Sequence, residues 1–320
     1  MSYNSIGVPR FFISDIQLMQ HLGLSHTFHY GNNVDKGFAN ITPSNQYTFT
    51  GDDNNLTRLD YPLSNSIDFM FVLGHNFKTA GMKTYLYDEN TGLAYGDSGI
   101  QIVNDCFNTT PQYDGWSMVR FNEYTPEPLN ANVYISGDGS EGKASSIVIG
   151  KSYTMPHSPD LKLSISYETG TKEQTTRGGA TLTNNMWEAR KWGDLPAWGF
   201  DSYAANPANT YFFNTAPRDR KVWDLSFSYL DKENTFPRYN SYNTLETEDV
   251  TDSSDQYTLI GSDDWYSQVW NKVNNQHSFI FQPDNTVNEF AICKIDGRSI
   301  KFTQTAFQKY NCKLRIREVW

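Results

Sequence analysis

The run IDFMFVLGHNF at residues 67–77 narrows the choice of fold more than any other stretch of the chain. Every position from 67 to 73 except Asp68 is apolar, and turn-forming residues bound the run. A short continuous apolar run of this kind is typical of a strand that is buried on both sides. We therefore predict a central strand here.

Many shorter runs of apolar or alternating character follow, each bounded by turn residues. Strands at such short spacing indicate a β-sandwich or jelly roll, and the absence of long Ala, Leu, Glu and Lys stretches makes a helical bundle a poor fit. The expected strands lie at residues 82–89, 116–124, 130–137, 143–156, 160–168, 220–230, 277–283, 288–296, 299–307 and 311–320.

Two segments predict short helices. The first, residues 14–24, begins with Ser14 or Asp15 as its cap, and the second, residues 262–275, begins with Ser262. The apolar stripe consists of Ile16, Met19 and Leu22 in the first helix, and of Trp265, Val269 and Val273 in the second.

Composition and charge narrow the classes of function. The 320 residues carry a formal net charge of −10 without any basic run, whereas nonspecific nucleic-acid binding needs a basic face. Because no stretch of about 18 apolar residues occurs, we expect no membrane-spanning helix. Residues 1–12 lack a basic region followed by an apolar core, so we expect no secretory signal.

The three cysteines, Cys106, Cys293 and Cys312, match no Cys-x-x-Cys metal or redox pattern. A disulfide between Cys293 and Cys312 across neighbouring strands is one alternative. Three unpaired, mostly buried thiols are the simpler expectation, and they suit a protein that folds in a cytoplasm.

His75 follows the central run in a Gly-His-Asn triplet, where either a catalytic role or a backbone role is conceivable. No Gly-x-Ser-x-Gly elbow accompanies it, and the surroundings of Cys106 resemble no catalytic cysteine site. We interpret Gly74 as a left-handed or bulged residue at the strand end, and Asn76 as a side-chain cap of the turn. His75 is then structural, and no catalytic residue is assigned.

The later run IVIGKSY at residues 147–153 ends in a similar way, with Gly150 after three apolar positions. We predict that the two runs are central strands that end at the same rim of one sandwich.

Two short stretches of the sequence carry side chains that could bind a metal ion. His21, His26 and His29 lie close together in sequence, but the helix expected to end at Gly23 leaves no fixed ligand geometry for zinc. Asp52 and Asp53 lie in an acidic turn that could hold a structural calcium ion, with a solvated turn as the alternative. We otherwise expect no cofactor.

Residues 169–220 read as an irregular loop rich in Gly, Asn and Pro. Trp187, Trp192 and Trp198 lie within it and follow neither a strand nor a helix period. Because exposed tryptophans need a cover, we expect this loop to form an assembly surface, with burial against the chain's own second domain as the alternative.

Several of these patterns together resemble tailed-bacteriophage virion proteins. They are NSIGVPRFFI at the start, FVLGHNF, IVIGKSYTMPHSPDL, and the closing HSFIFQPDN, EFAICKI and LRIREVW. The resemblance implies a galactose-binding-like jelly roll followed by a second β-rich domain that carries a Gly-Gly turn. It also implies a role in the virion without catalysis, and it carries over no individual ligand residue.

We therefore expect a mostly β protein with a jelly-roll domain at residues 1–160 and a β-rich assembly domain at residues 161–320. The expected function is that of a non-enzymatic tail component near the distal end or adaptor region, assembled as a symmetric ring in the virion after folding in a bacterial cytoplasm. Its partners are then copies of itself and other virion proteins. The alternatives are a module that binds host-surface glycan, a capsid decoration protein and a glycan hydrolase.

Overall fold

The computed structural model describes part of the chain, and the fold is built from these residues. The described residues are 7–21, 28–29, 41, 47–50, 57–61, 67–88, 93–94, 99–124, 131–137, 141–161, 163–185, 219–236, 263–273, 276–297 and 299–319.

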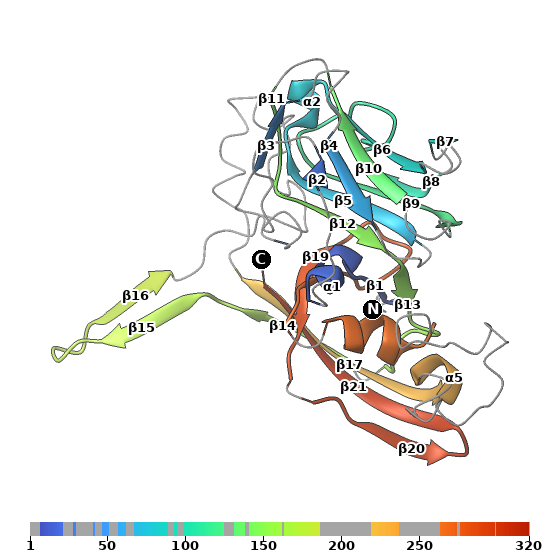
Figure 1. Cartoon of the computed structure of the whole chain (residues 1–320). Helices are drawn as coiled ribbons and strands as arrows, with labels where there is room; N and C mark the ends of the chain where they lie inside the picture. The colour runs from blue at the N-terminus through green and yellow to red at the C-terminus, as the bar shows by residue number, and fades with distance from the viewer. Residues whose placement is uncertain are drawn as a thin grey trace.

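The described part of the chain is mostly β, as the sequence predicts, with four short helices that hold 12% of its residues. Three sheets form successive layers (Figure 1), which we call the large, middle and outer sheets. The order is β13-β1-β18-β19-β21-β17-β14 in the large sheet, with β20 also paired to β21, β12-β5-β9-β8 in the middle sheet and β2-β4-β10-β6-β7 in the outer sheet.

The strands of the large sheet are β1 (Arg10–Phe12), β13 (Ser152–Thr154), β14 (Ser164–Glu168), β17 (Arg220–Asp231), β18 (Phe279–Gln282), β19 (Ala291–Ile295), β20 (Phe302–Ala306) and β21 (Lys309–Glu318). Those of the middle sheet are β5 (Ile67–His75), β8 (Gly99–Val103), β9 (Gly115–Tyr124) and β12 (Ser146–Gly150). Those of the outer sheet are β2 (Phe28–His29), β4 (Thr57–Tyr61), β6 (Lys83–Asp88), β7 (Leu93–Ala94) and β10 (Ala131–Ser136).

The remaining described elements are small. β3 (Tyr47–Thr50) pairs with β11 (Glu141–Ala144), and β15 (Thr171–Thr175) pairs with β16 (Thr181–Asn185). The helices are α1 (Asp15–His21), α2 (Phe77–Ala80), α5 (Lys232–Thr235) and the π-helix η5 (Tyr266–Asn271). None of the helices in the described part is long and apolar enough to cross a membrane.

Strand β5 is the centre of the layered structure, and all nine of its residues are buried. Its alternate side chains enter two different cores, because successive side chains of a strand point to opposite faces. Phe69 and Phe71 pack with the large sheet, while Met70 and Val72 pack with the outer sheet. The predicted strand with two buried faces is thus confirmed.

Two strands from the first half of the chain belong to the large sheet. β1 lies between β13 and β18, with Phe11 opposite Tyr153 on one side and Phe281 on the other. The sheet built mainly by residues after 161 therefore includes residues 10–12 and 152–154, and a single core lies between it and the middle sheet. The two regions expected as separate domains share backbone pairing.

Both predicted helices are present, with details that the sequence left open. Ser14 caps α1, because its Oγ accepts the backbone N–H of Gln17 (3.4 Å). The second helix is capped by Asp264, whose Oδ1 accepts the Ser267 N–H (2.9 Å). The proposed cap Ser262 lies outside the described residues. The predicted stripe of Trp265, Val269 and Val273 is buried.

A buried ion pair joins these two helical segments. Lys272 Nζ lies 2.7 Å from Asp15 Oδ1, and both side chains are at most 1% exposed. The pair connects the start of the chain to a segment 257 residues away. A buried pair of this kind adds little net stability over an apolar pair, but it strongly penalises any packing that separates its members.

The two glycine-ended strands lie at opposite rims, which corrects the sequence interpretation. β12 runs antiparallel to β5, with Ser146 opposite Leu73 and Gly150 opposite Phe69. Gly74 and Gly150 therefore mark opposite ends of the middle sheet. The sequence runs look alike, but only the pairing direction decides which ends meet.

Gly150 is required by a close approach of backbone and not by its dihedral angles. A Cβ at this position would lie 2.7 Å from the Ile13 carbonyl oxygen and 2.9 Å from Asp15 Oδ2. The absence of a side chain thus lets the segment before α1 pack against β12.

The Lys272→Met substitution should leave the Asp15 carboxylate buried without its partner and lower the free energy of unfolding by about 3–5 kcal/mol. The double variant Asp15→Leu, Lys272→Met should recover most of that loss, because it removes both charges. Urea denaturation measures both. A double variant as unstable as the single one would contradict this account.

The Gly150→Ala substitution should lower the free energy of unfolding by about 1–3 kcal/mol, because the backbone oxygen at 2.7 Å cannot move as a flexible side chain would. Gly178→Ala is the matched control, since the nearest atom to its Cβ is Thr176 Oγ1 at 4.0 Å. Equal effects of the two substitutions in urea denaturation would rule out the close-approach explanation.

Candidate functional site

His75 lies at the end of β5, where Gly74 has the left-handed φ of +63° and the pairing with β9 is bulged between Leu73 and His75. This geometry matches the predicted role of Gly74. The imidazole is 2% exposed and stacks on the Phe77 ring at 4.8 Å between centroids. Its Nδ1 accepts the Phe77 N–H (3.3 Å), and its Nε2 lies 2.8 Å from Ser117 Oγ.

The Ser117–His75 pair resembles a nucleophile and its base, but its hydrogen bonds run the wrong way. Because Nδ1 accepts a backbone N–H, the ring proton lies on Nε2, which donates to the hydroxyl and cannot take its proton. Burial lowers the pKa of His75 to about 3. Ser117 is 1% exposed, so a substrate has no access to it. The pair is a buried structural contact.

Cys106 belongs to the same buried cluster and is equally unsuited to attack. Its Sγ lies 3.4 Å from Thr84 Oγ1, and burial raises its pKa to about 11. The thiolate that would act as a nucleophile is therefore disfavoured. Cys293 and Cys312 are also buried and free, which confirms the expectation of three unpaired thiols.

Asn76 differs from its predicted role, because its side chain makes no capping hydrogen bond to α2. Instead, its Oδ1 accepts the Lys143 N–H (2.6 Å) and its Nδ2 donates to the Glu141 carbonyl (3.1 Å). The side chain thus holds β11 against the end of β5. The role of Asn76 depends on a tertiary contact, because a side-chain amide can hydrogen-bond to the backbone of a distant strand as well as to its own turn.

A seam of buried polar groups fixes the middle sheet to β13 of the large sheet. Asp68 accepts both the N–H and the hydroxyl of Ser152, each at 2.6 Å, and lies 3.6 Å from Arg120 Nε. Burial raises the pKa of Asp68 despite these contacts, which lower it. Because Asp68 is buried and both its oxygens accept hydrogen bonds from Ser152, these contacts restrict how the two sheets can pack.

Arg10 extends this seam to the next strand of the large sheet. Its Nε donates to Thr154 Oγ1 (2.8 Å), and its Nη1 donates to Gln282 Oε1 and Gln101 Oε1, both at 3.3 Å. Burial lowers the pKa of Arg10 to about 10. The guanidinium thus joins β1, β13 and β18 to β8 of the middle sheet.

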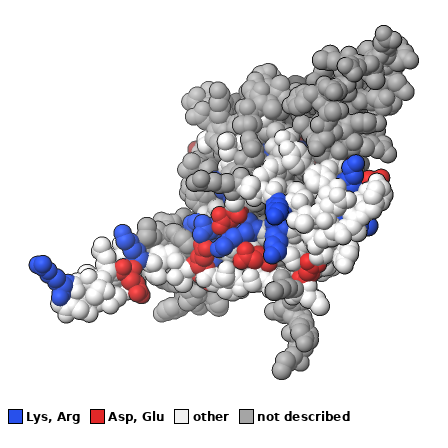
Figure 2. All heavy atoms as spheres, turned by 90° about the horizontal axis from the view of Figure 1, so that it is seen from below, with Lys and Arg blue, Asp and Glu red and all other residues white. Residues whose placement is uncertain are grey.

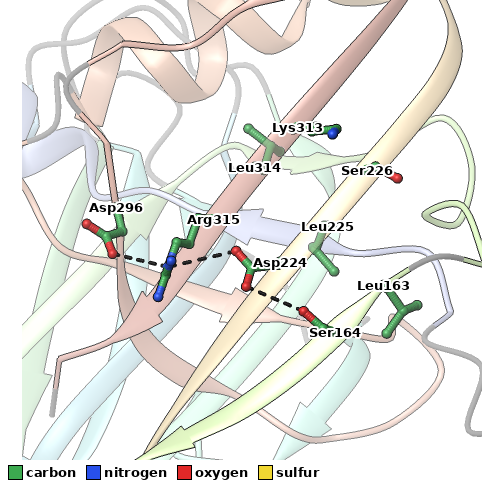
Figure 3. Close-up of a pocket in the computed structure, with 9 residues that line it drawn as sticks. All are labelled: Leu163, Ser164, Asp224, Leu225, Ser226, Asp296, Lys313, Leu314 and Arg315. Carbon is green, nitrogen blue, oxygen red and sulfur yellow. Dashed lines mark hydrogen bonds and ion pairs between the residues drawn. The ribbon is translucent and has the colours of Figure 1, made fainter.

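An open groove of about 440 Å³ lies on the large sheet (Figure 3). Arg315 Nε lies between two carboxylates, 3.3 Å from Asp296 Oδ2 and 3.8 Å from Asp224 Oδ1, and Ser164 donates to Asp224 (3.4 Å). The lining residues are Leu163, Ser164, Asp224, Leu225, Ser226, Asp296, Lys313, Leu314 and Arg315.

The chemistry of this groove offers little to a ligand. The cation of Arg315 already lies against the two carboxylates, and none of the nine lining residues is aromatic. In the view from below, Figure 2 shows Lys and Arg side chains mixed with Asp and Glu side chains. Such mixed charge does not attract a polyanion, and the groove has no aromatic ring on which a sugar could stack.

The most prominent exposed feature is the hairpin of β15 and β16, which we call the arm (residues 171–185). Figure 1 shows it projecting from the end of β14 away from the three sheets. Residues 171–184 are all exposed. Residues 176–180 form the turn, in which Gly179 has φ +82° and Thr176 Oγ1 accepts the Ala180 N–H (3.1 Å).

The arm corrects the expectation of an irregular loop over residues 169–220. Residues 171–185 form a regular hairpin, and residues 186–218 lie outside the described part of the chain. Threonine has a high β propensity, and the threonines of this segment were the one sequence feature that indicated strands. Because both faces of the arm are polar apart from Leu182, the alternation that usually reveals a strand was absent.

Several predicted positions lie where the structure says nothing of them. Trp187, Trp192, Trp198, Asp52, Asp53 and His26 are outside the described residues, and the side chains of His21 and His29 are not described. Within the described part, no three His, Cys, Asp or Glu side chains are grouped so that they could hold a metal ion.

Comparison with known proteins gives no relative: no protein-family model, curated protein or solved structure matches the chain.

The depressed pKa of His75 predicts a pH dependence of stability. The unfolded chain protonates this residue near pH 6.5, whereas the folded chain does so only near pH 3. Protonation therefore favours the unfolded state, and stability that is complete above pH 6.5 is lost as the pH falls toward 3. Between pH 7 and 5 the loss from His75 is about 2 kcal/mol.

The variant His75→Gln has no such titration, so its free energy of unfolding should fall less than that of the wild type between pH 7 and pH 5. Urea denaturation at the two pH values gives both differences. Other groups titrate in both proteins and cancel. Identical slopes would show that His75 is not buried as a neutral ring.

Proposed function

We propose that this chain is a non-enzymatic structural protein of a tailed-phage particle, a tail component near the distal end or adaptor region that assembles with copies of itself in a symmetric ring. The observation that carries the proposal is the arm, in which residues 171–184 are all exposed. The phage setting rests on the sequence resemblance described above.

The physical argument for assembly is that the arm lacks a cover. A two-stranded hairpin is marginally stable in water by itself, and it gains stability when a further strand or a packed face is added. Residues 171–184 have no such cover within the described part of the chain. A second molecule that covers the arm would supply it, and an oligomer of identical chains covers every arm in the same way.

The environment of the described serine, histidine and cysteine side chains discussed above supports a structural role for this proposal and not a catalytic one. The contact between Ser117 and His75 is buried and wrongly oriented for attack, and the thiol of Cys106 is protonated at neutral pH. The groove on the large sheet lacks the aromatic floor expected of a glycan site. This groove therefore gives no support to the carbohydrate-binding alternative, and nothing in the described residues separates a tail component from a capsid decoration protein.

Replacing residues 172–184 with Gly-Gly should leave the chain folded but unable to assemble or to enter particles. The body should keep its free energy of unfolding to within ~0.5 kcal/mol, because the removed residues are exposed. Sedimentation, urea denaturation and particle incorporation are the measurements.

Val287→Ser is the matched control, since this exposed apolar residue lies in the turn after β18, outside the arm, and should leave assembly unchanged. Normal incorporation of the shortened chain would refute the assembly role of the arm. Unfolding of the shortened chain would show that the arm belongs to the core.

A further inference from the structure

Two described strands that end a sheet are built alike, although they lie in different parts of the fold. β8 (GIQIV) ends the middle sheet, and β16 (TLTNN) is one of the two strands of the arm. Each has five residues without charge or proline. The pairing of β8 with β9 shifts its register between Gly99 and Gln101, so Gln101–Val103 form the regular part of that edge. Proteins usually protect an open strand edge with charges, prolines or bulges, because an unprotected edge can pair with another chain.

The other strand of the arm is protected in this sense. β15 (TKEQT) carries Lys172 and Glu173 within its five residues. Charged side chains on an edge disfavour the addition of a further strand. Of the two edges of the arm, β16 is therefore the one suited to pairing.

Both uncharged strands also expose branched apolar side chains. Leu182 of β16 is 60% exposed, and Ile100 and Ile102 of β8 are 54% and 41% exposed. Ile102 is paired with Val119 of β9, which belongs to the core between the middle and outer sheets. β8 thus extends the apolar face of the middle sheet from the buried core to the solvent. A further strand beside β8 would cover its exposed apolar side chains.

The positions of the two strands decide how copies would meet. In Figure 1 the arm projects to the left, while β8 lies on the right of the body. A contact between features on opposite sides of one molecule is heterologous, so it joins copies head to tail and generates a ring when the rotation closes. A contact between features on one side would instead give a two-fold dimer.

We infer that β16 of one copy adds to the open edge of β8 in the next copy, with Leu182 covered by Ile102. Backbone hydrogen bonds along the regular residues 101–103 of β8 would supply the pairing, and the apolar side chains would fix its register. This inference rests on the proposed function and names the surface that receives the arm.

Disulfide trapping with the full chain tests the contact. Leu182→Cys protein is mixed with Ile102→Cys protein under mild oxidation, and the same is done with Ile100→Cys to cover the neighbouring register. We expect a covalent dimer in a mixture and none from either protein alone. The native Cys106, Cys293 and Cys312 are buried and do not compete.

Two controls test the geometry. Thr183→Cys, on the opposite face of β16, should not cross-link to Ile102→Cys, because side chains alternate along a strand. In sedimentation, Leu182→Lys should reduce the oligomer to a monomer, whereas Lys172→Ala, on the same face of the arm, should not.

Other results overturn the inference. Cross-linking of Leu182→Cys alone means that arms pair with arms, and cross-linking to Tyr167→Cys means that arms are exchanged across a two-fold axis at β14. A monomeric, internally bridged Leu182→Cys, Ile102→Cys chain means that the arm folds back. Absence of any cross-link also refutes the pairing of β16 with β8. If shortening the arm nevertheless abolishes assembly, only the choice of β8 as the acceptor strand is wrong, and the proposed function stands.

Discussion

The burial of β5 on both faces is the constraint on which the rest of the structure depends. A strand with apolar side chains on two faces needs a packed layer on each, so the middle sheet cannot be a surface. The large sheet supplies one layer and the outer sheet the other. The chain supplies the large sheet partly from its start and partly from its end, so that one core unites residues far apart in sequence.

Buried charges then select one arrangement of these layers. Asp15 with Lys272 connects α1 to η5, and Asp68 with Ser152 connects the middle sheet to β13. Apolar contacts have no direction, so burial of apolar area alone distinguishes less sharply between alternative packings. A buried charge distinguishes them more sharply, since separation from its partner costs several kcal/mol. The apolar layers thus stabilise the fold, while the polar contacts between them restrict its geometry.

The sequence predicted those elements whose pattern is local. The run around β5 and the stripe from Trp265 to Val273 repeat with strand and helix periods, and both were identified correctly. Relations between distant segments were not accessible. The antiparallel pairing that puts Gly150 at the rim opposite Gly74, and the contact of Asn76 with β11, depend on tertiary neighbours. The arm was missed because polar residues on both its faces conceal a period of two.

The body buries its potentially reactive groups, whereas the arm exposes its strands to solvent. In the body, His75, Ser117 and Cys106 are buried and contact polar neighbours, and Arg315 in the groove of the large sheet lies against two carboxylates. The arm carries its strands into solvent, where a hairpin gains little from its own contacts. A chain that restrains its reactive groups and exposes uncharged strand edges is suited to forming contacts with other chains. Its edges are therefore where its interactions should be sought.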